Sequence, residues 1–395
     1  MALIRLDEPS TRRIPPDTFS LFALGFRPFY LLAALYAVLA LLLWVPVQAG
    51  LIEMPMPGIW WHAHEMLFGF AAAVIVGFLL TAGKAWTGLE TPTGRPLAAL
   101  ATLWFAGRLA MALGSGPWAA ALDLAFLPLC AAIFVALLLR AKSRRNYFIG
   151  GLLAVLALSN LAFHLARFGV LALDPLVTLH FALCLIVVLE TVIAGRVVPM
   201  FTANAVRGVR QWRNKRFDYT AIACTALALV LWVSGGSVAG AGVAVLAALL
   251  QLVRCAGWNP WATRSNPLLW VLHLSHLWIP LGLLLLAATQ WGALPRSAAI
   301  HALAIGATGG LIIGMITRTA LGHTGRLLVA GPIETLAYLL VQLAALTRVL
   351  TVALIPVAAG VGVHVAATLW VGAFLLYLWR YTPFLMRARA DGKPG

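Results

Sequence analysis

Long apolar runs dominate this sequence, and most are long enough to cross a lipid bilayer. A helix needs about 20 apolar residues to span the hydrocarbon core, because each residue adds about 1.5 Å along the axis. A break of Ser and Gly at 234–237 divides one long stretch into a tight helical hairpin. The pattern therefore predicts an all-α, polytopic membrane bundle of about twelve transmembrane helices. The runs are 20–47, 59–83, 96–113, 117–139, 147–168, 174–200, 217–235, 237–255, 267–289, 297–320, 332–353 and 356–380.

Composition excludes a soluble protein. Hydrophobic residues make up 62% of the chain and charged residues only 10%, which is too little polar surface for a water-soluble domain of this length. The longest loop, near 203–216, is short, so we expect one transmembrane domain over 1–395. We find no pattern of a cleaved signal peptide. The four cysteines are widely spaced and are expected to be small buried residues.

The distribution of basic residues sets the orientation of the chain. A net charge of +16 is compatible with nucleic-acid binding, but these side chains lie in short loops between the spans. With the N-terminus inside, only Arg108, Arg167, Arg296 and Arg348 fall on the outer side, as the positive-inside rule requires. We therefore expect cytoplasmic tails at 1–18 and 383–395, contact with anionic lipid, and no nucleic-acid partner.

The stretch Trp60-Trp61-His62-Ala63-His64-Glu65-Met66 places two imidazoles and a carboxylate at the mouth of the second run. Ionisable groups inside a membrane are costly and point to function. Residues two apart on an α-helix lie roughly 200° apart, so His62 and His64 are expected to serve two different centres. Glu65 is the candidate catalytic residue: it orients a ligating imidazole or carries protons.

Depth along the spans places five histidines in one layer near the outer leaflet: His62, His64, His164, His180 and His301. Such a layer suits a haem lying edge-on between helices, with axial imidazoles from facing sides and outer arginines pairing with its propionates. We take His62, His64, His301 and His180 as the candidate metal ligands. The alternative for each is a hydrogen-bonded contact between helices. His273 and His276 lie in the inner half, three residues apart on one face.

A second dense stretch runs from His301 to Arg326. Its glycines, Gly306, Gly309, Gly310 and Gly314, allow close approach of a flat ring or simply of a packed helix. At its cytoplasmic end lie Arg318, His323 and Arg326, and Arg196 reaches the same face from another span. These residues are candidates for binding an anionic headgroup, a quinone or a propionate, or for satisfying helix ends.

Four stretches resemble the NnrS family of membrane proteins. The chain is similar to that family in Gly25-Phe26-Arg27-Pro28-Phe29, Trp61-His62-Ala63-His64-Glu65-Met66-Leu67-Phe68-Gly69, Gly195-Arg196-Val197-Val198-Pro199-Met200-Phe201-Thr202 and Leu321-Gly322-His323-Thr324-Gly325-Arg326. The family has an aromatic residue where His276 stands here, which favours His273 as the functional histidine of the two. The resemblance implies a haem- and copper-containing inner-membrane protein of the nitric oxide response, often accompanying denitrification.

A more distant likeness connects the chain to the catalytic subunit of haem-copper oxidases and nitric oxide reductases. That subunit also has twelve helices, with haem ligands on the second and tenth, and one helix carries a His-x-His pair that serves two haems. The likeness is one of fold only. This chain lacks the adjacent His-His pair of that subunit's copper site, which argues against a copper-assisted reaction.

The leading hypothesis is a protein that binds one or two b-type haems and reduces or detoxifies nitric oxide, with a quinol or another electron donor. An alternative is a non-enzymatic haem or copper sensor, carrier or metal-trafficking protein. A second alternative is a secondary transporter, since twelve spans is also a common transporter plan.

Overall fold

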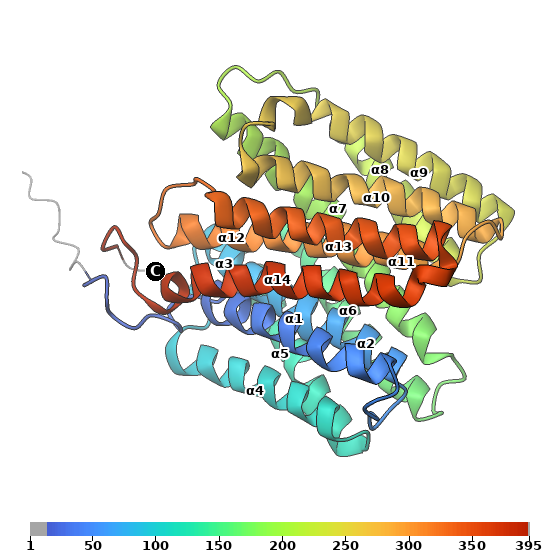
Figure 1. Ribbon diagram of the computed structural model, residues 1–395. Helices are drawn as coiled ribbons and strands as arrows, with labels where there is room; N and C mark the ends of the chain where they lie inside the picture. Colours follow the sequence, from blue (N-terminus) through green and yellow to red (C-terminus); the bar gives the residue numbers. More distant parts are fainter. Residues whose placement is uncertain (1–13, 394–395) are drawn as a thin grey trace, which may run out of the picture.

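Helices account for the architecture throughout the part of the chain described, residues 14–393 of a computed structural model (Figure 1). Within these residues 12 helical spans are long and apolar enough to cross a membrane, which confirms the predicted all-α, multi-pass fold. The helical segments are α1 (Phe26–Gln48), α2 (Gly58–His64), η1 (Glu65–Ala71), α3 (Ala72–Thr87), α4 (Gly94–Leu113), α5 (Pro117–Arg140), η2 (Arg144–Asn146), α6 (Tyr147–Arg167), α7 (Pro175–Ala205), α8 (Lys215–Val233), α9 (Val238–Gly257), η3 (Pro260–Thr263), α10 (Pro267–Gln290), α11 (Arg296–His301), η4 (Ala302–Gly309), α12 (Gly310–His323), α13 (Pro332–Leu354), η5 (Pro356–Ala358) and α14 (Ala359–Met386).

Both described ends of the chain lie at the same end of the bundle (Figure 1). The amide of Ile14 donates to the carbonyl of Gly392 at 3.1 Å, so the two ends are in direct contact. An even number of spans has this consequence. Parts of the predicted tails, residues 1–13 and 394–395, lie outside the described residues.

The last helix is longer than its apolar run. The apolar run predicts a helix over 356–380, whereas α14 begins at Ala359 and continues to Met386. Arg27, at the start of α1, donates to the carbonyls of Leu385 (3.1 Å) and Arg387. A buried guanidinium at a helix C-terminus satisfies free carbonyls and complements the negative end of the helix dipole. The Gly-Phe-Arg-Pro-Phe stretch thus joins the first span to the last.

Two spans are interrupted by π-helical turns. The second span changes from α2 to the π-helix η1 at Glu65 and returns to α-helix at α3. The tenth span changes from α11 to η4 at Ala302 and returns at α12. These are also the two most buried spans of the bundle. Each π segment begins directly after a candidate ligand, His64 or His301, and π turns inside α-helices often mark functional sites.

Candidate functional site

A cavity of about 330 Å³ lies in the half of the bundle that contains α2 and α11. Its wall comes from six parts of the chain: α1, the α2–η1 segment, α7, the α11–η4 segment, α13 and α14. Three of the four candidate metal ligands, His62, His180 and His301, line it. The volume is in the range of small-molecule and cofactor sites.

His62 and His64 face different surroundings, as their spacing predicted. The ring of His62 lines the cavity and stacks on the indole of Trp44, with ring centroids 4.4 Å apart and planes at 16°. Its Nδ1 is buried and has no hydrogen-bond partner among the described residues. His64 is completely buried on another side of the same helix.

A hydrogen bond fixes the tautomer of His301 so that one ring nitrogen is able to bind a metal. Its Nδ1 lies 2.7 Å from the backbone carbonyl of Ser297, which can only accept, so Nδ1 carries the proton. The other ring nitrogen, Nε2, then has a free lone pair in a side chain that lines the cavity. Metal-ligating histidines typically have their second nitrogen fixed in this way.

A positive charge and two hydroxyls complete the polar lining. Arg348 donates to the Ser297 hydroxyl at 3.4 Å, while its Nη1 is buried without a partner among the described residues. The Thr308 hydroxyl also lines the cavity and is buried without a well-formed hydrogen bond. Apolar and aromatic side chains, including Trp370, form most of the remaining wall.

His64 and Glu65 belong to a buried ionic network beside the cavity. Glu65 accepts two hydrogen bonds from Arg108 Nη1, both at 2.8 Å, and a short one from the Tyr36 hydroxyl. Arg108 Nη2 forms a short ion pair with Asp123. The carboxylate of Glu65 therefore faces Arg108, Tyr36 and His64, and it is not part of the cavity wall.

The sequence reasoning missed three members of this network. Tyr36, Asp123 and Asn160 come from α1, α5 and α6, and the last two are almost completely buried. The signal was available for Asp123, an acidic residue inside the apolar run 117–139. Such a residue suggests function by default, but the run alone does not show which histidine it meets.

The glycines near the histidines serve packing. A Cβ on Gly69 would lie 2.6 Å from the Tyr36 ring, so this glycine in η1 lets Tyr36 reach Glu65. On η4, the position of a Cβ on Gly306 is 2.3 Å from the Trp278 indole, and that on Gly309 is 2.4 Å from Trp370. The flat rings that approach η4 are thus tryptophans of the chain itself, which is the helix-packing alternative.

The basic residues that we predicted to face the inside lie in separate surroundings. Arg318 lies over the ring of Phe201, with its guanidinium carbon 4.0 Å from the centroid, and Arg326 lies 3.9 Å over Phe384. Arg196 donates to Asn146 at 2.8 Å. These three arginines contact different helices, and a shared binding pocket for them stays a prediction.

The inner histidines are also outside the cavity wall. His323 packs against the ring of Phe26, and His273 lies 3.0 Å from the Thr202 hydroxyl. His276 is fully buried against Trp258. All three contact neighbouring helices. His273 does so through a hydrogen bond, whereas both ring nitrogens of His276 lack a hydrogen-bond partner among the described residues.

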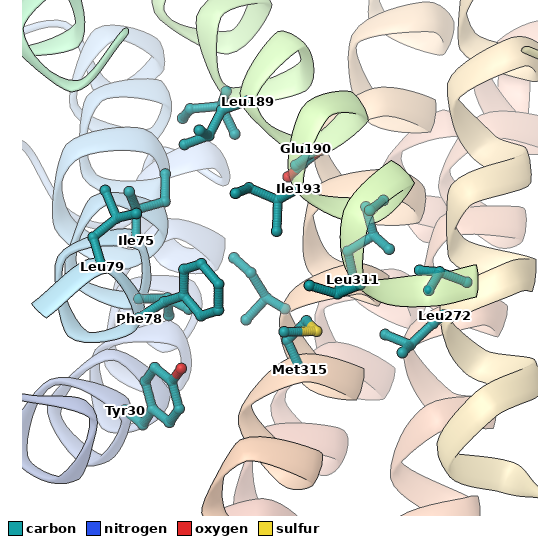
Figure 2. A pocket seen from close by; sticks show the side chains of 16 residues that line it. Tyr30, Ile75, Phe78, Leu79, Leu189, Glu190, Ile193, Leu272, Leu311 and Met315 are labelled. Atoms are coloured by element: carbon teal, nitrogen blue, oxygen red, sulfur yellow. The ribbon is translucent and has the colours of Figure 1, made fainter. Parts of the chain in front are cut away.

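A second, smaller cavity of about 80 Å³ lies between α1, α3, α7, α10 and α12 (Figure 2). Its wall is almost entirely apolar, and Glu190 of α7 brings a carboxyl group into it, as Figure 2 shows. One oxygen, Oε2, is buried without a partner among the described residues. The Thr308 side chain, which lines the larger cavity, lies next to this carboxyl group.

Comparison with known proteins identifies the family of this chain. None of the curated proteins searched matches the chain. The family model described as "NnrS protein" matches residues 20–389, which include all twelve spans. The chain therefore belongs to the NnrS family.

Proposed function

We propose that His62 and His301 hold a b-type haem in the larger cavity, and that the protein reduces or otherwise detoxifies nitric oxide there. Membership of the NnrS family fits a membrane protein of the nitric oxide response. The observation that carries the proposal is the convergence of His62, His301 and His180 on one cavity of about 330 Å³.

The donor atoms fit such a group. His62 has an orphaned buried nitrogen, and His301 has a lone pair left free by its bond to Ser297. These are two imidazoles from different spans, the ligand set of many b-type haems. The unpartnered Nη1 of Arg348 suits a propionate carboxylate, which would satisfy it with a charge-assisted hydrogen bond. Trp44 fixes the plane of the His62 ring by stacking on it.

When bound, a haem would supply the one-electron redox chemistry that the reduction of nitric oxide requires. The surrounding protein would supply orientation and a dry, mostly apolar enclosure, because the cavity wall contains few polar groups. Reduction also requires electrons and protons. We propose a quinol or another donor of the inner membrane for the electrons.

Glu190 is the group best placed to deliver protons to the cavity. The sequence indicates only Glu65 for this role, but Glu65 is engaged by Arg108 and Tyr36. Glu190 instead has an unpartnered oxygen and lies beside Thr308. Thr308 is part of the wall of the larger cavity. Acidic residues inside a membrane often belong to proton relays.

The test is haem content of separate variants purified in detergent. We expect His62→Ala and His301→Ala to lose most of the bound haem, measured by pyridine haemochrome spectra against protein concentration. His364→Ala is the matched control, because His364 is an exposed histidine on α14. Unchanged haem content in both cavity variants would refute the ligand assignment.

An anaerobic assay with a chemical reductant and nitric oxide then separates an enzyme from a sensor or carrier. Consumption of nitric oxide that depends on bound haem supports the reductase. Full haem content without any consumption would instead favour the non-enzymatic alternative.

A further inference from the structure

Three ligand-type side chains meet in the buried network next to the cavity. One atom from each of His64, Asp123 and His164 lies within 4.8 Å of the other two, and all three residues are buried. Asp123 Oδ2 is 3.3 Å from His64 Nε2 and 2.8 Å from His164 Nε2. The three residues come from α2, α5 and α6, so the cluster joins three separate spans.

The hydrogen bonds around His64 lack one donor proton. Its Nδ1 faces a carboxylate oxygen of Glu65 at 2.7 Å. Its Nε2 faces Asn160 Oδ1 at 2.9 Å and Asp123 Oδ2 at 3.3 Å, and these groups are also acceptors. A neutral imidazole has only one proton, so one of its two nitrogens must confront acceptors with a lone pair.

Turning the Asn160 amide does not resolve the conflict. In the present orientation its Nδ2 donates to Asp123 Oδ2 at 2.8 Å. The reversed amide would donate to His64 but would bring its oxygen against the Asp123 carboxylate. In either orientation, lone pairs converge on the space between His64 and Asp123.

The network also contains more carboxylate groups than cations in direct contact with them. Glu65 and Asp123 are paired with one arginine, Arg108, which contacts both. Arg167, at the end of α6, donates to His164 Nδ1 at 3.0 Å, and the ion pairs of the two carboxylates within the described part of the chain do not include it. One buried carboxylate charge is thus left without a cation in direct contact, and an unbalanced charge is strongly unfavourable at this depth. A proton on His64 would bring these three charges to zero, whereas a divalent ion would bring them to +1, so the case for a metal ion rests on the ligand geometry.

We propose that His64, Asp123 and His164 bind a divalent first-row transition cation, of which Zn²⁺ is the simplest probe. Two imidazole nitrogens and a carboxylate oxygen are ligands that such ions favour. Neighbouring ligand atoms of a tetrahedral ion lie about 3.4 Å apart when metal–ligand bonds are about 2.1 Å. The 3.3 Å separation of His64 and Asp123 matches this value, and the His164 ring needs only a small outward shift.

Neighbouring residues hold the proposed ligands through hydrogen bonds. Glu65 receives the Nδ1 proton of His64, which directs the lone pair of Nε2 toward the site, as in carboxylate–histidine–metal triads. Arg108 occupies the other oxygen of Asp123 and leaves Oδ2 for the site. Binding at His164 requires Arg167 to release Nδ1, which then carries that ring's proton. Because the cluster is separate from the wall of the His62 cavity, its occupancy does not require the haem.

Metal analysis of the wild-type protein decides the proposal. We expect about one equivalent of a transition metal per chain after purification without chelator, measured by mass spectrometry together with haem. After removal of that metal, Co²⁺ alone should bind with the visible ligand-field bands of a site with nitrogen and oxygen ligands, and Zn²⁺ should displace it. No metal in the isolated protein and no Co²⁺ binding would refute the site and leave a proton on His64 to balance the charge.

Variants assign the ligands. Asp123→Asn and His164→Gln should weaken Co²⁺ binding at least 100-fold, and Glu65→Gln should weaken it about 10- to 100-fold as a partner outside the first shell. His62→Ala is the matched control, expected to lose haem while it keeps the cation. Wild-type affinity in both the Asp123→Asn and His164→Gln proteins would contradict the assignment, and the titration of the wild type stands if either variant fails to fold.

Discussion

At the scale of single residues, two histidines separated by one alanine have different surroundings. His62 and His64 lie within one turn of α2, yet His62 faces an open cavity and His64 a closed ionic network. The carboxylates divide in the same way. Glu65 is held by an arginine, whereas Glu190 has a free oxygen beside the cavity wall. We therefore expect Glu190, and not Glu65, to carry protons.

Glu190→Gln tests this distinction. The amide keeps the size and hydrogen-bonding capacity of the side chain but cannot exchange a proton at this depth. We expect haem content to stay at the wild-type level and nitric oxide consumption to fall about 100-fold or more, the lower range for loss of a proton-transferring group. Glu53→Gln, in an exposed loop, is the control and should leave consumption unchanged. Wild-type consumption by Glu190→Gln would remove Glu190 from the proposal.

At the scale of elements, the π turns decide where the histidines point. A π turn accommodates one extra residue within an α-helix, so it rotates the part before it relative to the part after it by about 100°. η1 and η4 follow His64 and His301 directly, and each carries residues of the cavity wall, such as Met66 and Thr308. The two π segments thus set the orientation of α2 and α11 toward the cavity.

Deletion of Ala304 from η4 should convert the π turn into ordinary α-helix. His301 would then rotate by about 100° away from the cavity while α12 keeps its place. We expect haem content to fall as far as in His301→Ala, with helix content by circular dichroism unchanged. Deletion of Gly292, in the loop between α10 and α11, is the control and should retain haem. Normal haem content in the Ala304 deletion would show that η4 does not position the ligand.

At the scale of the whole molecule, twelve spans bring the two described ends together. The positive-inside rule predicts that this end faces the cytoplasm. The larger cavity is lined by His62 near the start of the second span and by His301 near the start of the tenth. In the predicted orientation it would lie in the outer half. Nitric oxide, a small apolar molecule, would reach it from the bilayer or from the outer side.

Reporter fusions test this orientation. Green fluorescent protein fused after Gly395 should fluoresce, and alkaline phosphatase at the same position should be inactive. Alkaline phosphatase inserted after Gly292 should be active, since the loop between α10 and α11 is expected outside. Active phosphatase at the C-terminus would invert the topology and place the cavity in the inner half.

The sequence by itself determined the number of spans and the opposed directions of His62 and His64. Both follow from local physics: the length of apolar runs and the 3.6-residue period of the helix. It also indicated His301 and His180 as partners of His62, because depth along a span can be counted in residues.

Only the tertiary structure decided which side chains meet. Asp123 is one of several polar residues inside apolar runs, and nothing local says that it joins His64 and His164. The same holds for the inner arginines, which the sequence placed at one depth but which contact different rings. Depth is a property of one helix, whereas contact depends on the rotation and neighbours of every helix, and those are set by packing across the whole bundle.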